Sequence, residues 1–166
     1  MFDPKEILEV LNKHQVEYIL IGGVAATLHS CPEQTYDVDI LYNGSIDNKE
    51  RLLNALKAME ARWDLPLTAG LLDKQPVFAL NTKHGDLDIF SHVPGIGCYD
   101  DALKFKETSK YNDVDICILN VEGWIKSKEQ VIGDESNPRK RGTFEYMKAL
   151  KMKEDISPDE GSGFSI

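Results

Sequence analysis

The sequence has little that would place it in a membrane, outside the cell or along extended nucleic acid. No apolar run approaches the roughly 20 residues that span a bilayer, and residues 2–5 do not begin a signal peptide. Its three cysteines are scattered, odd in number and not spaced as metal ligands, which is typical of reduced intracellular thiols. The formal net charge of −9 disfavours extended nucleic-acid binding, which depends on neutralising phosphates. We therefore expect a cytoplasmic protein with no membrane partner.

What the sequence does contain fits one globular domain. Its 166 residues are 42% hydrophobic and 28% charged, an ordinary composition for a folded chain. We expect one domain over residues 1–153 and a disordered acidic tail over residues 154–166, which carry Gly and Ser beside acidic residues. Eight of the nineteen Lys and Arg lie in residues 126–153, so a short contact with a tRNA stays open.

The hydrophobic pattern and the turn residues alternate between helical and extended segments. Strands are expected over residues 16–21 and 35–42, and as two strand pairs within residues 77–90 and 108–119. Helices are expected over residues 4–14, 23–29, 121–131 and 143–152, and a capping box at residues 47–50 predicts the start of another.

Two glycines and two aspartates lie close together early in the chain. An apolar strand ends at Gly22 and Gly23, which open a short helix, and the next strand carries Asp37 and Asp39. Because strand side chains alternate, both aspartates emerge on one face. Neighbouring carboxylates repel unless a cation lies between them, and such oxygen ligands suit Mg²⁺ with phosphates completing its shell. The glycines let the backbone approach those phosphates. The free N–H groups at the start of the helix can donate hydrogen bonds to the phosphate oxygens.

Two further Asp-x-Asp segments compete to supply a third carboxylate. Asp86 and Asp88 lie on a strand that could neighbour the first pair, with apolar residues at the alternate positions. Asp113 and Asp115 follow a polar turn, where acidic residues protect an exposed sheet edge from pairing with other chains. We take Asp115 as structural. Asp86 and Asp88 share a face, so both stay candidates.

The whole pattern resembles a known family signature. Gly22-Gly23, thirteen intervening residues and then Asp37-Val38-Asp39-Ile40 are similar to the motif of the DNA polymerase β-like nucleotidyltransferase superfamily. The segment 85–90 resembles the strand that carries the third carboxylate of that family, with Asp88 as the better match and Asp86 as the alternative. The likeness is closest to minimal bacterial members, which include lincosamide and other antibiotic nucleotidyltransferases and toxin–antitoxin nucleotidyltransferases.

This resemblance implies both a fold and a reaction. The fold is an α/β (α+β) nucleotidyltransferase core, a small mixed sheet with helices packed on one face plus C-terminal helices. The reaction moves a nucleoside monophosphate from an NTP to an acceptor hydroxyl. Asp37, Asp39 and Asp88 are then the catalytic and metal-binding residues and hold two Mg²⁺ ions.

The resemblance also implies the nucleotide contacts. Gly22, Gly23 and Thr35 belong to the family's nucleotide-binding pattern, and Ser127-Lys128-Glu129 resembles a segment whose helix brings a lysine toward the nucleotide. An ordinary solvated lysine is the alternative for Lys128. The sequence departs from the pattern at Glu33, where relatives often carry Arg four residues before the first aspartate. A carboxylate in that place would repel a triphosphate if it faced the nucleotide.

Three hypotheses for the function stay open. The acceptor could be a small molecule such as an antibiotic, or it could be a partner protein or tRNA of a toxin–antitoxin system. The third hypothesis is a catalytically silent nucleotide-binding or interaction module, which the departure at Glu33 keeps open. The basic run at residues 139–141 is interpreted as a solvated loop, and His92 as a surface residue.

Overall fold

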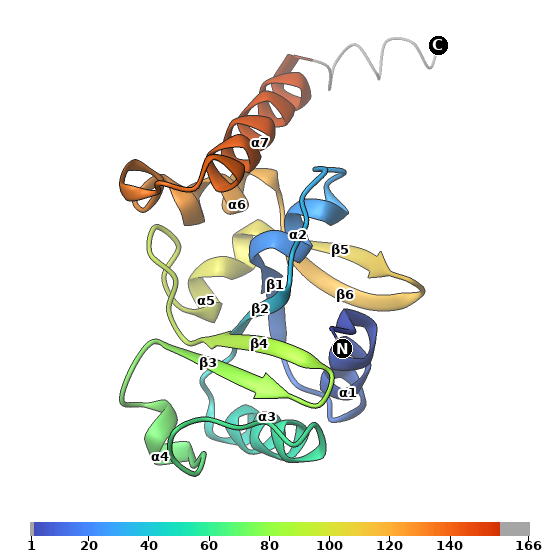
Figure 1. Cartoon of the computed structure of the whole chain (residues 1–166), viewed down its shortest axis with the longest axis vertical. Helices are drawn as coiled ribbons and strands as arrows, with labels where there is room; N and C mark the ends of the chain where they lie inside the picture. The colour runs from blue at the N-terminus through green and yellow to red at the C-terminus, as the bar shows by residue number, and fades with distance from the viewer. Residues whose placement is uncertain (1, 157–166) are drawn as a thin grey trace.

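The fold is built around a six-stranded mixed sheet in the computed structural model, which describes residues 2–156 (Figure 1). The strand order is β3-β4-β2-β1-β6-β5. The strands are β1 (Tyr18–Ile21), β2 (Asp37–Tyr42), β3 (Val77–Thr82), β4 (Gly85–Phe90), β5 (Lys106–Tyr111) and β6 (Val114–Leu119). The central pair β1–β2 is antiparallel, the pairs β2–β4 and β1–β6 on either side of it are parallel, and the outer pairs β3–β4 and β5–β6 are antiparallel. The mixed sheet and both predicted strand pairs are confirmed.

Helices occupy the connections and the two ends of the described chain. They are α1 (Pro4–Lys13), α2 (Gly22–Leu28), α3 (Ile46–Ala58), α4 (Ala69–Leu72), α5 (Tyr99–Ala102), α6 (Val121–Glu129) and α7 (Pro138–Ile156), with short 3₁₀ helices η1 (Leu103–Phe105) and η2 (Ile132–Asp134). Within residues 2–156, no helix is both long and apolar enough to cross a membrane.

The two faces of the sheet differ in character. Residues that are register partners on one face are fully buried or nearly so; they are Leu20, Val38, Ile40, Phe78, Leu80, Leu87 and Ile89. Helix α1 contacts β2, β4 and β6 and also contacts α3, and both helices bury leucines there. The strands therefore send their alternate side chains, among them those of Asp37, Asp39 and Asp88, to the opposite face.

Local capping explains where the first helices begin. The Asp3 carboxylate accepts a hydrogen bond of 3.2 Å from the Glu6 amide, as the sequence predicts. The capping box predicted to start at Asp47 is wrong, because the Ser45 hydroxyl accepts from the Asn48 amide at 3.3 Å and starts α3 earlier. Asp47 lies instead in the first turn, where its negative charge complements the helix dipole.

The C-terminal part of the chain is more helical than the sequence pattern predicts. Helix α7 begins at Pro138, not at Thr143, and continues through residues 154–156. The rest of the predicted tail, residues 157–166, lies outside the described residues. In Figure 1, α7 runs above α6 and away from the sheet, and its described helix contacts are with α6 and η2. Its first turn therefore lies near the end of the sheet where α2 and α6 meet.

Candidate active site

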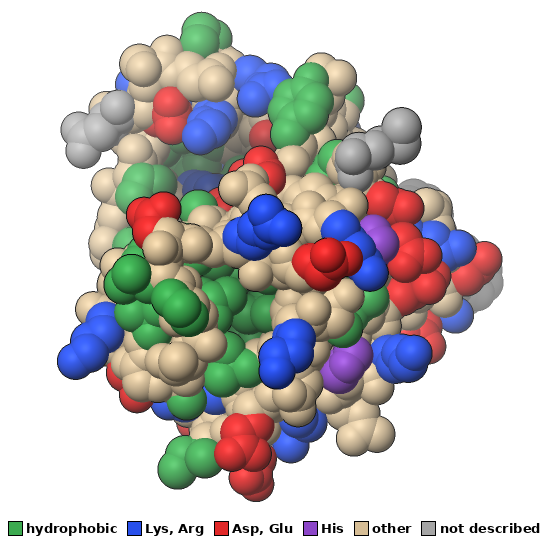
Figure 2. Space-filling view, turned by 60° about the horizontal axis from the view of Figure 1, so that its bottom comes forward, with side chains coloured by type: hydrophobic (Ala, Val, Ile, Leu, Met, Phe, Trp, Pro, Cys, Tyr) green, Lys and Arg blue, Asp and Glu red, His purple; other side chains and the backbone are tan. Residues whose placement is uncertain are grey.

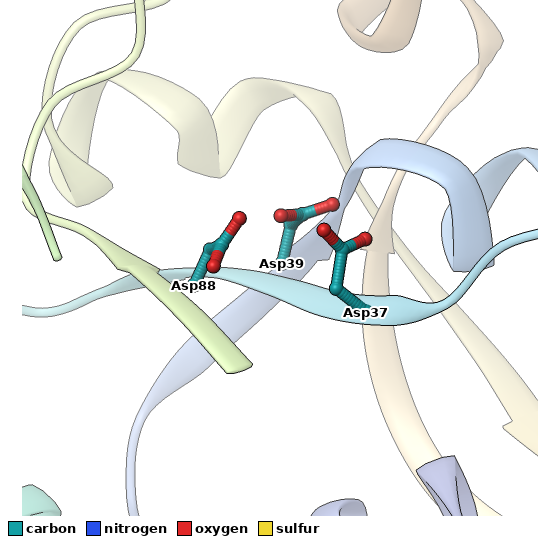
Figure 3. A group of neighbouring side chains, drawn as sticks. All are labelled: Asp37, Asp39 and Asp88. Carbon is teal, nitrogen blue, oxygen red and sulfur yellow. The ribbon is translucent and has the colours of Figure 1, made fainter. Parts of the chain in front are cut away.

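Three carboxylates from two adjacent strands converge above the open face of the sheet. Asp37 and Asp39 lie on β2, and Asp88 lies on β4 directly opposite Asp39 in the parallel register. One oxygen from each carboxylate lies within 4.8 Å of the others. Figure 3 shows the three side chains rising from their strands toward a common space. In the described part of the chain, this is the one group of His, Cys, Asp or Glu side chains arranged to hold a metal ion.

The electrostatics of this cluster favour a bound cation. Burial, followed by the charges of Asp37 and Asp88, raises the pKa of Asp39 from 3.8 to about 8. Burial also raises the pKa of Asp88, although a hydrogen bond shared with Asp39 partly offsets that effect. Without a cation, the cluster therefore retains a proton at neutral pH. A divalent ion would replace that proton and relieve the repulsion, so the donor set fits a hard cation such as Mg²⁺.

The other acidic candidates lie outside the cluster. Asp86 stands opposite Asp37 in register, but its side chain is exposed and accepts a hydrogen bond of 2.6 Å from the Asn81 amide. Asp115 lies on β6, exposed beside Lys110 at 3.3 Å. The structure thus brings Asp88, and neither Asp86 nor Asp115, to Asp37 and Asp39.

A strained glycine turn brings the backbone against the carboxylates. Gly22 follows β1 with a φ of +71°, and a Cβ placed on it would lie 2.2 Å from Oδ2 of Asp39. The indole Nε1 of Trp124, on α6, donates a buried hydrogen bond of 2.9 Å to the Gly22 carbonyl. Only glycine fits this turn, and Trp124 fixes it from the other side.

Gly22→Ala should therefore damage both the fold and the metal site. A left-handed backbone costs alanine roughly 1 kcal/mol, and relief of the clash must also displace the Asp39 carboxylate. We expect a melting temperature several degrees lower and a large loss of Mg²⁺ affinity, measured by thermal unfolding and by Mg²⁺ titration. Gly44→Ala is the matched control, since nothing lies within 4 Å of its Cβ position. Equal behaviour of the two variants would contradict this account of the turn.

All seven residues assigned to the site from the sequence line one cavity of about 640 Å³. They are Gly22, Gly23, Thr35, Asp37, Asp39, Asp88 and Lys128. Thr35 Oγ1 donates to the Asp37 carbonyl at 3.1 Å and lies 3.0 Å from the Cβ position of Gly23. Lys128 Nζ lies 5.9 Å from the Trp124 ring centroid, and its charge lowers the pKa of Asp39. Lys128 therefore lies at the cavity, and its contact with a nucleotide stays a prediction.

Glu33 faces the same cavity. Its carboxyl carbon lies 3.6 Å from the Cβ position of Gly23, and its Oε2 is buried without a hydrogen-bond partner among the described residues. The loop therefore does not turn this carboxylate out into solvent. His92 also lines the cavity, with an exposed side chain.

Sequence reasoning missed several residues of the cavity wall. Residues 139–141 were expected in a solvated loop, but Arg139 and Lys140 lie in the first turn of α7 and line the cavity. Cations at the amino end of a helix oppose the helix dipole, and this turn contains no acidic residue. That unfavourable placement is the signal from which a functional role could have been inferred. Trp124 gave no such signal, since an apolar residue on a helix is ordinary.

Two solved structures have a similar fold. A crystal structure of the lincosamide antibiotic adenylyltransferase LnuA with lincomycin bound matches at a TM-score of 0.63 and 16% identity, over 90% of this chain and 98% of that one. ANT(2")-Ia with adenylyl-2"-tobramycin matches at 0.65 and 12% identity, over 91% and 88%. No family model and no curated protein matches the sequence. The chain therefore has the nucleotidyltransferase fold, as its resemblance to the DNA polymerase β-like superfamily implies.

Proposed function

We propose that the protein is a Mg²⁺-dependent nucleotidyltransferase that moves a nucleoside monophosphate from an NTP to an acceptor hydroxyl. The observation that carries this proposal is the convergence of Asp37, Asp39 and Asp88 beside the turn at Gly22, in one cavity. The glycine turn lets the backbone lie directly against the Asp39 carboxylate, and three carboxylates supply the oxygen ligands for the ions that accompany a nucleotide.

Each residue has a role that its position supports. Asp37 and Asp39 would hold two Mg²⁺ ions, and Asp88 would complete the second site and accept the proton of the acceptor hydroxyl. When bound, the ions supply the positive charge that stabilises the entering and leaving oxygens. No described side chain caps α2, so backbone N–H groups at its amino end, near Gly23, are left for phosphate oxygens. Thr35 and Lys128 would line the path of the triphosphate.

The bonds formed and broken in this transfer balance with the two substrates and Asp88. The acceptor oxygen bonds to the α-phosphorus while the bond from that phosphorus to the bridging oxygen of the β-phosphate breaks. Pyrophosphate leaves, and the hydroxyl proton passes to the carboxylate of Asp88. Positioning and electrostatic stabilisation supply most of the rate in such a transfer.

Two observations favour a small-molecule acceptor and an adenine nucleotide donor. LnuA is an adenylyltransferase of lincosamide antibiotics, and ANT(2")-Ia was solved with adenylyl-2"-tobramycin. A cavity of about 640 Å³ has the size of a small-molecule site. On the face shown in Figure 2, acidic and basic side chains are mixed. Such a surface gives an RNA backbone little to bind.

A labelled-donor assay tests the proposal. Purified protein would be incubated with each of the four α-³²P-labelled NTPs and with small-molecule hydroxyl acceptors, protein and tRNA, in Mg²⁺ or in excess EDTA. We expect label transfer and equimolar pyrophosphate release in Mg²⁺ alone, with ATP as the preferred donor. Failure of the protein to bind any Mg-NTP would contradict the proposal and favour the silent interaction module.

A further inference from the structure

The cavity that holds the carboxylates is also lined by cations of the two C-terminal helices. Lys128 lies on α6, and Arg139 and Lys140 lie in the first turn of α7. The loop that follows α2, which α7 contacts, contributes Glu33, whose Oε2 is buried without a hydrogen-bond partner among the described residues. A polyphosphate in this cavity would thus be repelled by Glu33 and attracted by the cations of α6 and α7.

Contacts along α7 orient its first turn toward that loop. The Tyr146 hydroxyl donates a hydrogen bond of 3.0 Å to the Ser30 carbonyl, and the buried Thr143 hydroxyl contacts the Cys31 thiol. Arg139, Thr143 and Tyr146 are spaced four and three residues apart, so they share one face of the helix. Arg139 therefore lies one turn from Thr143 on the face that meets the loop, with Glu33 in the same cavity wall.

Arg139 differs from its neighbouring cations in its contacts with the described side chains. Lys140 Nζ lies 3.8 Å from the Glu135 carboxylate, and Arg141 donates to the carbonyls of Glu135 and Gly133. Among the side chains that the structure describes, none forms a hydrogen bond or an ion pair with the Arg139 guanidinium. A planar guanidinium left in a cavity suits two-point binding of phosphate oxygens.

We propose that Arg139, assisted by Lys140, binds the β- and γ-phosphates of the donor nucleotide from the α7 side and takes the place of a cation on the loop that carries Glu33. This inference rests on the proposed nucleotide site. Since the β- and γ-phosphates leave as pyrophosphate, Arg139 contacts the part of the donor that is released. A nucleoside monophosphate lacks those groups, so its affinity does not depend on Arg139.

Equilibrium binding in Mg²⁺ tests this assignment with three probes: the non-transferable analogue α,β-methylene-ATP, inorganic tripolyphosphate and AMP. Arg139→Gln should weaken the first two by about tenfold, the size of one charge-assisted contact, and should leave AMP unchanged. The loss should shrink as salt is raised. Lys148→Gln removes the same charge from α7 outside the cavity, beside the Phe144 ring, and should change none of the three affinities.

A double variant tests directly whether a cation on the loop can replace the cation on α7. Glu33→Arg introduced into Arg139→Gln should restore triphosphate affinity to within about threefold of the wild type, because it removes the repelling carboxylate and supplies a cation to the same cavity. Thermal unfolding of each variant would confirm that the fold persists.

The outcomes separate this inference from the proposed function. Wild-type binding of the ATP analogue with no loss in Arg139→Gln would overturn the role of Arg139 and leave the proposed function standing. Tripolyphosphate binding that depends on Arg139, without any nucleotide binding, would support the phosphate site and contradict the nucleotidyltransferase. Absence of binding for both probes would overturn both.

Discussion

Asp88→Asn should lower nucleotide transfer by on the order of 10³-fold, whereas Asp86→Asn should leave the rate within about threefold of the wild type. The two aspartates share one face of β4 and lose the same charge in these variants. Asp88 belongs to the carboxylate cluster, while Asp86 is exposed and bonded to Asn81. The difference in rate between the two variants therefore reports the effect of losing a carboxylate of the cluster, because both variants lose one negative charge in the same region.

Single-turnover rates with saturating Mg-NTP and acceptor would measure this effect, and thermal unfolding would show that both variants fold. The asparagine at residue 88 can still offer an oxygen to a metal ion but cannot accept the proton of the acceptor. Nucleotide affinity should consequently fall less than the rate. A loss in Asp86→Asn equal to that in Asp88→Asn would show that the third carboxylate has been assigned to the wrong residue.

The local parts of the site could be predicted from the sequence because their determinants are local. Gly22 and Gly23 end an apolar strand, and the alternation of strand side chains places Asp37 and Asp39 on one face whatever the rest of the fold. The assignment of Asp88 needed one further step, the parallel pairing of β2 with β4. From the sequence the two strands could only be called possible neighbours, and the choice of Asp88 over Asp86 came from the family resemblance. The structure pairs the strands in parallel and places Asp88 directly opposite Asp39.

The parts that sequence reasoning missed depend on contacts between distant residues. The bond from Trp124 to the Gly22 carbonyl joins positions 102 residues apart, and the bond from Tyr146 to Ser30 joins positions 116 apart. No periodicity within α6 or α7 indicates which loop each helix will meet. Arg139 and Lys140 were consequently assigned to a solvated loop. The misplaced start of α3 is a local error, since Ser45 and Asp47 are both good caps and backbone geometry decided between them.

Glu33 shows how a departure from a family pattern gains meaning from structure. In the sequence it is only a carboxylate where relatives often carry a cation. In the structure its carboxylate is half-buried in the cavity and Oε2 has no described partner, an arrangement that is costly unless something compensates. The cations of α7 line the same cavity. The departure therefore does not by itself favour a silent module, because the positive charge is still present.

Without metal, the wild-type protein should lose stability as the pH rises from about 4 to about 8, and Asp39→Asn should abolish much of that loss. The pKa of Asp39 is about 8 in the folded state against 3.8 for an ordinary aspartate, chiefly because of burial and the neighbouring carboxylates. Between these values the folded protein retains a proton that the unfolded chain releases, so the free energy of unfolding falls as pH rises. The slope is at most about 1.4 kcal/mol per pH unit.

Urea unfolding at about pH 5, 6.5 and 8, in EDTA or in Mg²⁺, would measure this effect. Because the proton is shared with Asp88, we expect a loss of about 2 kcal/mol across the series for the wild type relative to Asp39→Asn. The comparison cancels groups that titrate alike in both proteins. Asp115→Asn, at an exposed site outside the cluster, should follow the wild type.

Magnesium should reverse the loss in the wild type, and most strongly at the highest pH, because the ion competes with the proton held by Asp39. The variant should gain little from Mg²⁺ at any pH, since a neutral amide replaces the carboxylate that both ions would share. The variant would then be the more stable protein in EDTA and the less responsive one in Mg²⁺. We expect this reversal because a cluster of carboxylates that binds metal lowers the stability of the metal-free protein. Equal stabilisation of both proteins by Mg²⁺ would place the metal site elsewhere in the chain.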